Sequence, residues 1–166
     1  MPRKRLKHIT LNPSKIIHVI DLFSDDRFMK EALKEAEKAF AADEVPVGAI
    51  VVCQNRIIAR AHNLTERLND VTAHAEMQAI TAASNYLGAK YLKECTLYVT
   101  LEPCSMCAGA LFWSQVGKVV FGAADLKRGF IDNGGKLHPK TEIVQGVLEQ
   151  ECAGLMTEFF RKKRGV

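Results

Sequence analysis

Residues 96–122 read TLYVTLEPCSMCAGALFWSQVGKVVFG, and this stretch decides the fold. The β-branched, aromatic and leucine residues at 96–101 predict a strand. Pro103 ends that strand and favours the start of a helix over about 104–114, since proline is tolerated in a helix's first turn. Residues 118–122 predict another strand. A parallel pair of strands needs a crossover of about a dozen residues, which this helix supplies.

Before this unit, the spacing of apolar residues predicts a helix, a β-hairpin and a second helix. Ser24 and Thr72 could cap the two helices. The predicted ranges are about 26–42 for the first helix, 47–53 and 57–61 for the hairpin strands, and about 73–87 for the second helix.

After this unit, a glycine-containing irregular stretch at 124–140 precedes a strand at 141–144 and an amphipathic helix at 148–164. Strands that alternate with helices in one small domain predict a central sheet covered on both faces. We therefore expect an α/β fold, a three-layer α/β/α arrangement around a mixed five-stranded sheet. The last helix is expected to turn Leu148, Cys152, Leu155, Met156, Phe159 and Phe160 inward.

The composition is that of a soluble globular protein. The 166 residues are 48% hydrophobic and 25% charged, which excludes a disordered chain. A membrane-spanning helix needs about 20 consecutive apolar residues, and no such run occurs. Residues 1–22 are predicted to be a basic tail or arm and not a signal peptide, because no apolar segment follows the first charges. Residues 23–166 are predicted to be one domain, and the cytoplasm is the expected location.

Positive charge gathers at the two ends of the chain. The net charge is +4, with basic runs at 3–7 and 161–164. Without those runs, acidic side chains outnumber basic ones. Basic ends suit contact with nucleic-acid phosphates, and they also occur as simple solvated chain ends.

The five cysteines do not predict a disulfide framework, because they are odd in number and follow no secretory signal. Cys53, Cys95 and Cys152 lie among apolar residues and are predicted to be small buried hydrophobic side chains. Cys104 and Cys107 differ, since residues three apart share one face of a helix.

A cysteine pair at a helix start favours the thiolate form and has three interpretations: a redox pair, half of a structural zinc site, or part of a catalytic zinc site. A structural site usually needs a second pair of ligands, which is absent. A catalytic zinc needs three protein ligands, and one histidine would complete the set. His74 is the candidate, because His74 and Cys104 both open helices that follow sheet elements and are expected at one edge of the sheet.

His74-Ala75-Glu76 followed by Pro103-Cys104-x-x-Cys107 resembles the signature of zinc nucleobase deaminases. The flanking sequences are similar to the bacterial tRNA-specific adenosine deaminase family. They read EVPVGA at 44–49, TAHAE at 72–76, LYVTLEPCSMCAGA at 97–110 and KVVFGA at 118–123. The resemblance covers about residues 26–164.

This resemblance implies a cytidine-deaminase-like fold and makes 23–166 a zinc deaminase domain. It implies one Zn²⁺ per subunit, held by His74, Cys104 and Cys107. A zinc-activated hydroxide would deaminate adenosine to inosine at the wobble position of a tRNA anticodon, with Glu76 as proton shuttle.

The resemblance also implies the substrate contacts and the assembly. Asn63 would contact the nucleoside, Ala75 would offer backbone contact to the base, and Val45, Pro46 and Leu101 would line the pocket. The tRNA anticodon stem-loop is the implied partner, with Arg161, Lys162, Lys163 and Arg164 on its phosphates, and a homodimer is expected.

Two rival functions remain. A deaminase of a free base or nucleoside, such as guanine, cytosine or cytidine, would use the same zinc site without needing basic ends. A non-catalytic RNA-binding subunit would often lack Glu76, which is present here. A redox protein explains neither His74 nor Glu76.

Overall fold

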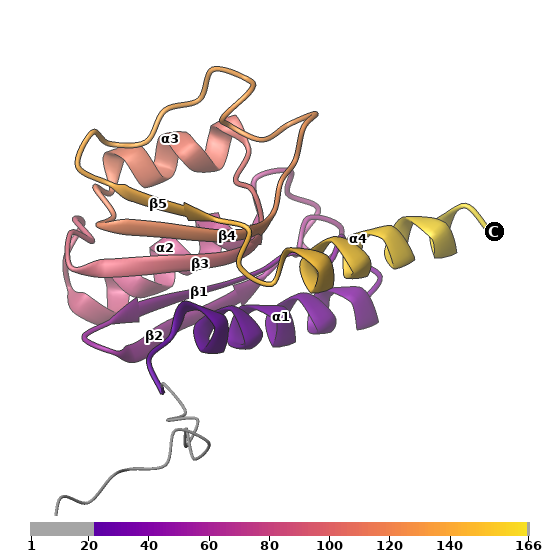
Figure 1. Ribbon diagram of the computed structural model, residues 1–166, viewed down its shortest axis with the longest axis horizontal. Helices are drawn as coiled ribbons and strands as arrows, with labels where there is room; N and C mark the ends of the chain where they lie inside the picture. Colours follow the sequence, from indigo (N-terminus) through magenta and orange to yellow (C-terminus); the bar gives the residue numbers. More distant parts are fainter. Residues whose placement is uncertain (1–21, 166) are drawn as a thin grey trace, which may run out of the picture.

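The computed structural model describes residues 22–165, which form one five-stranded sheet and four helices (Figure 1). The predicted basic arm at 1–22 lies outside the described residues, apart from Leu22. The elements are α1 (Asp25–Ala41), β1 (Gly48–Cys53), β2 (Arg56–His62), α2 (Ala75–Leu87), β3 (Cys95–Leu101), α3 (Ser105–Trp113), β4 (Lys118–Ala123), β5 (Glu142–Gln145) and α4 (Glu149–Lys163).

The sheet is mixed, as predicted. Its strand order is β2-β1-β3-β4-β5; β1 is antiparallel to β2 and β3, while β3, β4 and β5 are parallel. Helix α2 connects β2 to β3, and α3 connects β3 to β4. The irregular segment 124–141 makes the remaining parallel connection, from β4 to β5, without a helix. The carboxyl ends of β2, β3 and β4 therefore share one edge of the sheet.

Two apolar cores separate the helices into layers. One core packs α2 and α3 against one face of the sheet through Ala79, Leu111, Leu97 and Val119. The other packs α1 and α4 against the opposite face through Met29, Cys152, Ile50 and Val120. Alternating strand residues thus face different cores, which confirms the three-layer α/β/α arrangement.

Local sequence signals explain the first elements. The Ser24 hydroxyl accepts a hydrogen bond from the Arg27 amide and caps α1, where Asp25 and Asp26 complement the helix dipole. Gln54 and Asn55 both have positive φ angles, 49° and 60°. Such a pair makes the tight hairpin turn that matches the twist of the flanking strands.

Gly48 allows β1 to approach α1 closely. A Cβ atom at this position would lie 2.1 Å from the Ala32 carbonyl oxygen and 2.3 Å from the Ala36 nitrogen. Both alanines are fully buried. Alanine side chains on the helix and the absence of a side chain at Gly48 therefore let the two backbones touch where β1 begins.

The structure corrects three expectations. Thr72 does not cap α2; its hydroxyl and amide bind Asp70, and His74 occupies the N-cap position. Phe160 is 41% exposed, because the buried face of α4 carries Cys152 and Phe159 instead, and Phe159 packs against Phe40 of α1. Cys53 is half-buried, since it ends β1 near the edge of the sheet. Across residues 22–165, no helix has the length and apolar character that a membrane span requires.

Candidate active site

The starts of α2 and α3 carry the predicted metal ligands. His74 is the N-cap of α2 and Cys104 is the N-cap of α3, each with an extended backbone. Neither side chain caps its own helix. Both helices start at the carboxyl edge of the sheet, so the two side chains are free to approach each other there.

Several hydrogen bonds hold His74 in place. Its amide binds the Thr72 carbonyl at 2.7 Å. The Gln78 side-chain amide donates to the carbonyls of His62 and Ala73, at 2.8 Å and 3.1 Å. Gln78 thereby ties the start of α2 to the end of β2 and fixes the backbone that presents the imidazole.

A buried carboxylate fixes the turn that carries Cys104. Glu102 is 5% exposed and accepts hydrogen bonds from the amides of Asp125 and Ile131, at 3.0 Å and 2.9 Å. A Cβ atom on Gly129 would lie 2.2 Å from the Glu102 side chain, so this loop position requires glycine. Loop 125–131 is thus held against the 102–104 turn.

His74, Cys104 and Cys107 converge. The His74 Nδ1 atom lies 3.7 Å from the Cys104 Sγ and 3.5 Å from the Cys107 Sγ, and the three donor atoms lie within 4.8 Å of one another. A tetrahedral zinc ion would separate a nitrogen and a sulfur ligand by about 3.6 Å. The donor set and its spacing fit zinc, with one coordination position left over.

The pKa values of the two cysteines shift in opposite directions. The hydrogen bond from the Cys107 thiol, supported by His74, lowers the pKa of Cys104 to about 3. The adjacent Cys104 thiolate, together with burial, raises the pKa of Cys107. The hydrogen bond to Cys104 also raises the pKa of His74. Cys104 is therefore already a thiolate, the form that binds metal.

Glu76 lies beside this cluster in the first turn of α2. It is 3% exposed, and burial raises the pKa of its carboxyl group to about 7. Its carboxylate is within hydrogen-bonding range of Cys107. A carboxyl group with a pKa near neutrality both takes up and releases protons readily, which suits a proton shuttle.

The predicted substrate residues come from segments joined to this site. Asn63 is 5% exposed, and its backbone N–H donates to the Val47 carbonyl at 3.0 Å. The backbone N–H of Leu64 donates to the Ala73 carbonyl beside His74. Val45 and Pro46 precede Val47, and Ala75 follows His74. Leu101 ends β3 three residues before Cys104. These hydrogen bonds join the Asn63 segment to the segments that carry Val45, Pro46 and His74, while the substrate contacts of all five residues stay predictions.

The predicted RNA-contact residues lie in the other layer, at the end of α4. All four are exposed. Arg161 pairs with Glu158, and Lys163 pairs with Asp43. The Lys163–Asp43 contact places the end of α4 beside the segment that leads into Val45 and Pro46.

Sequence reasoning does not single out two buried acids. Glu44 and Glu102 both lie within the motifs quoted above, but the sequence analysis gives neither of them a role. In the structure, Glu44 is 1% exposed, and Glu102 organises the metal-binding turn. Each is an acidic residue next to a short apolar run, and that signal could have marked both as buried.

The sequence pattern of the cytidine and deoxycytidylate deaminase zinc-binding region matches residues 23–123. The chain belongs to this deaminase family. The tRNA-specific adenosine deaminase of Bacillus subtilis is 50% identical to it over 146 residues, which cover 84% of this chain and 91% of that protein.

Solved structures of the deaminase family are similar as well. A structure from a study of A-to-I editing by tRNA:A34 deaminases at the wobble position is 42% identical, with a TM-score of 0.73 over 77% of this chain and 97% of that one. Guanine deaminase from Bacillus subtilis is 36% identical, with a TM-score of 0.59 over 67% and 68% of the two chains.

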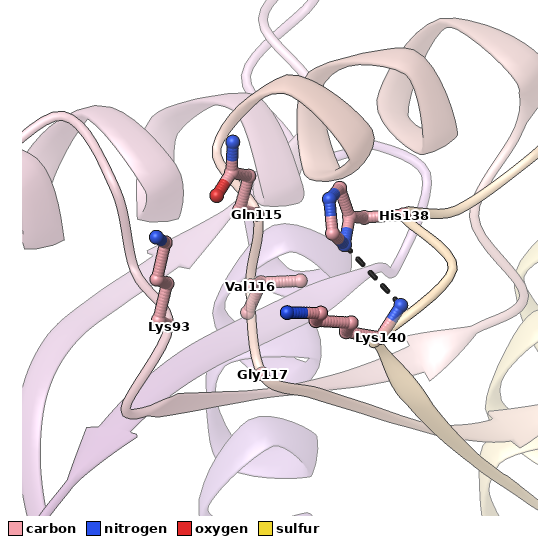
Figure 2. Close-up of a pocket in the computed structure, with 6 residues that line it drawn as sticks. All are labelled: Lys93, Gln115, Val116, Gly117, His138 and Lys140. Atoms are coloured by element: carbon pink, nitrogen blue, oxygen red, sulfur yellow. Dashed lines mark hydrogen bonds between the residues drawn. The ribbon is translucent and has the colours of Figure 1, made fainter.

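A separate cavity of about 290 Å³ lies at the opposite edge of the sheet (Figure 2). Lys93, Gln115, His138 and Lys140 line it, from the segments that precede β3, β4 and β5. The deaminase ligands follow the carboxyl ends of strands, whereas this cavity lies at the amino ends. It is therefore not part of the deaminase site.

Proposed function

We propose that this protein deaminates adenosine to inosine at the wobble position of a tRNA anticodon. The observation that carries the proposal is the cluster of His74, Cys104 and Cys107 beside the buried carboxyl group of Glu76. The family match and the 50% identity to a tRNA-specific adenosine deaminase support this substrate.

Three residues would hold one zinc ion per subunit: His74 through Nδ1, and Cys104 and Cys107 through Sγ. Zinc in such a site lowers the pKa of a water molecule towards about 7 and so supplies hydroxide at neutral pH. The positive ends of the α2 and α3 dipoles point at the same place and favour negative charge there.

Glu76 would move the protons. Its carboxylate takes a proton from the attacking water and delivers it to N1 of adenine, because addition at C6 places electron density on that nitrogen. It then takes the proton of the C6 hydroxyl and gives it to the departing amine. The C6–N6 bond breaks, and water plus adenosine gives inosine plus ammonia.

The pocket residues would hold the nucleoside beside Glu76. Val45, Pro46 and Leu101 supply apolar walls for the purine, Ala75 offers its backbone to the base edge, and Asn63 offers a side-chain amide. RNA sequence is usually read from unstacked bases in loops, which such a pocket can accept.

The C-terminal basic run would bind phosphates of the anticodon stem-loop. The ion pair of Lys163 with Asp43, two residues before Val45, supports this role for Arg161, Lys162, Lys163 and Arg164. A tRNA substrate also makes the cytoplasm the place of action. Residues 23–166 would form the deaminase domain and residues 1–22 a basic arm.

We also propose a homodimer. Met106 and Trp113 lie seven residues apart on α3 and are 37% and 77% exposed; Leu126 and Ile131, in the loop after β4, are 78% and 50% exposed. An exposed apolar face of this kind marks an interaction surface. Because α3 carries Cys107, a partner on this face would lie close to the active site.

A free-base deaminase is the second candidate, favoured by the similarity to guanine deaminase. The deciding test incubates zinc-loaded protein with an anticodon stem-loop bearing adenosine at the wobble position and measures inosine after nuclease digestion. Inosine in that strand supports the proposal. Its absence, together with turnover of guanine, would support the second candidate.

A further inference from the structure

Glu44 is a buried acid that the proposed chemistry leaves unused. It follows α1 and is 1% exposed. Burying a carboxylate is costly unless it is paired or hydrogen-bonded. Within residues 22–165, no lysine, arginine or histidine forms an ion pair with Glu44. Its partners are all neutral donors.

All of those donors come from the segment after β2. Glu44 Oε2 accepts from Asn63 Nδ2 at 3.2 Å and from the Glu66 amide at 3.2 Å. Glu44 Oε1 accepts from the Arg67 amide at 2.7 Å. The Thr65 hydroxyl lies 3.4 Å from Oε2. One carboxylate therefore shapes the turn that begins at Asn63.

These contacts fix the orientation of the Asn63 side chain. A carboxylate only accepts hydrogen bonds, so the NH₂ group of the amide must face Glu44. The same Nδ2 lies 3.2 Å from the Thr65 hydroxyl. In the part of the chain that the structure describes, no hydrogen bond ends on Asn63 Oδ1. The amide is thus held by its nitrogen, and its carbonyl oxygen is left for another partner.

We propose that Glu44 is a positioning residue for the substrate. It holds the Asn63 side-chain amide in one of its two possible orientations and so determines which of its atoms, Nδ2 or Oδ1, faces the nucleoside. This role rests on the proposed function, in which Asn63 contacts the nucleoside. Within residues 22–165, the hydrogen-bond partners of Glu44 include none of His74, Glu76, Cys104 and Cys107.

Glu44→Gln is the informative change, because it keeps the size of the side chain and replaces one acceptor oxygen by a donor NH₂. That NH₂ group must face either the Arg67 amide or Asn63 Nδ2, which places donor against donor. In the first arrangement the turn that begins at Asn63 loses its contact at Arg67 and shifts; in the second the Asn63 side chain itself is released or flipped.

The test is a double-mutant cycle with Glu44→Gln and Asn63→Ala, in which kcat and KM are measured on the wobble-adenosine stem-loop. In the wild-type background, Glu44→Gln should raise KM about 5- to 30-fold, the loss of one to two hydrogen bonds. In the Asn63→Ala background, it should change KM less than twofold, because coupled residues are not additive. An equal rise in both backgrounds, or no rise in the wild-type background, would overturn the proposal.

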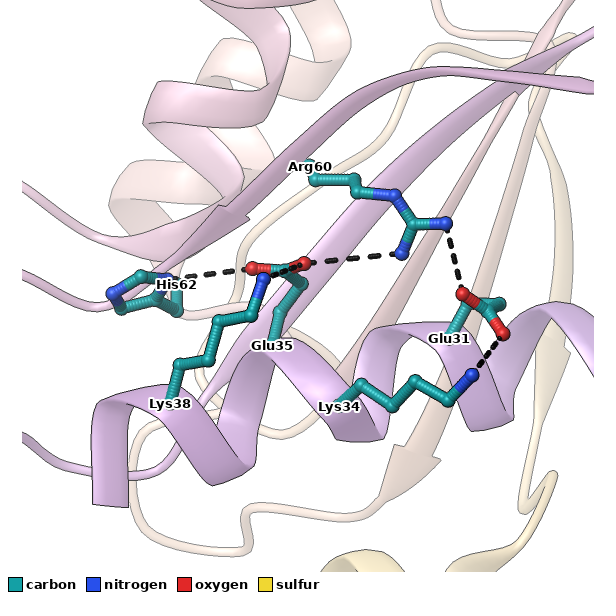
Figure 3. Close-up of polar contacts among 6 residues, drawn as sticks. All are labelled: Glu31, Lys34, Glu35, Lys38, Arg60 and His62. Carbon is teal, nitrogen blue, oxygen red and sulfur yellow. Dashed lines mark hydrogen bonds and ion pairs between the residues drawn. The ribbon is translucent and has the colours of Figure 1, made fainter. Parts of the chain in front are cut away.

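Glu35→Gln is the matched control. Glu35 is 3% exposed, but its partners are the side chains of Lys38, Arg60 and His62 in the network between α1 and β2 (Figure 3). This variant should lower the unfolding midpoint in urea and leave KM unchanged in both backgrounds. A matching rise of KM would mean that loss of any buried carboxylate has this effect.

If Glu44→Gln does not fold, Thr65→Val replaces it in the cycle, since the Thr65 hydroxyl contacts both Glu44 and Asn63. It should raise KM about 2- to 5-fold, and only while Asn63 is present. Turnover of the stem-loop by the wild type tests the proposed function separately. If free guanine is the substrate instead, the same cycle is run with guanine and the same outcomes decide.

Discussion

His74 Nδ1 and Cys104 Sγ lie 3.7 Å apart, although both residues occupy N-cap positions of different helices. N-cap side chains usually bind amides of their own helix. Here both turn away and meet over the edge of the sheet. The cost of two uncapped helix starts is offset by a site in which two helix dipoles favour bound anions and thiolates.

Glu76→Gln should lower turnover by orders of magnitude and keep zinc. Glutamine has nearly the same shape but cannot take a proton from water, so kcat should fall about 10²- to 10⁴-fold. Zinc content, measured by metal analysis of the purified variant, should stay at the wild-type level. Loss of zinc from this variant would make Glu76 a ligand.

Cys104→Ala should remove zinc and lower stability, because the free energy of metal binding no longer stabilises the folded state once a ligand is lost. The expected results are a fall in bound zinc and an unfolding midpoint that no longer responds to a chelator. Cys53→Ala is the control, since Cys53 lies half-buried at the end of β1, in a strand outside the metal cluster. Full zinc occupancy in Cys104→Ala would contradict the ligand assignment.

Gly48→Ala should destabilise the fold by about 3 kcal/mol, because its Cβ would overlap the backbone of α1 and neither strand nor helix can yield easily. Gly154→Ala is the opposite case. Gly154 lies in α4 with nothing within 4 Å of an added Cβ, so alanine should stabilise by about 0.5–1 kcal/mol. Urea unfolding of both variants measures the difference. Equal effects would show that the close approach of β1 to α1 contributes nothing.

Replacing Arg161, Lys162, Lys163 and Arg164 by Gln should weaken tRNA binding and reduce the dependence of affinity on salt. Each phosphate that the variant no longer neutralises makes the negative slope of log K against log salt concentration shallower, by about 0.9 for duplex and 0.7 for single strands. Lys93→Gln with Lys140→Gln, at the opposite edge of the sheet, is the control and should bind as the wild type does. An unchanged slope in the fourfold variant would make the C-terminal run a solvated helix end.

Local sequence is enough to predict the elements of this fold, because its signals agree. Ser24 caps α1, Gln54 and Asn55 form the hairpin turn, and Pro103 separates β3 from α3. The mixed character of the sheet also follows, since a hairpin joins antiparallel strands and helices connect parallel ones. Thr72 is the exception: its hydroxyl binds Asp70 two residues away, a local contact that competes with capping.

The metal-binding cluster is harder to predict from spacing alone. His74 and Cys104 are 30 residues apart, and helical periodicity does not relate them. The motif resemblance suggests the pairing, and the shared carboxyl edge of the sheet explains it. The roles of Glu44 and Glu102 could not be predicted, because their partners lie in distant loops, which no local pattern marks. These partners are backbone amides for both acids and, for Glu44, also the Asn63 side chain.

The most direct measurement of the central claim is ammonia release by zinc-loaded protein, with four substrates side by side. These are an anticodon stem-loop with adenosine at the wobble position, free adenosine, cytidine and guanine. We predict that the wild type turns over the stem-loop but not free adenosine, cytidine or guanine. We predict that the Glu76→Gln variant largely loses turnover of the stem-loop. Turnover of a free base or nucleoside, with none of the stem-loop, would contradict the assignment to tRNA. Such a result would support only deamination at the zinc site.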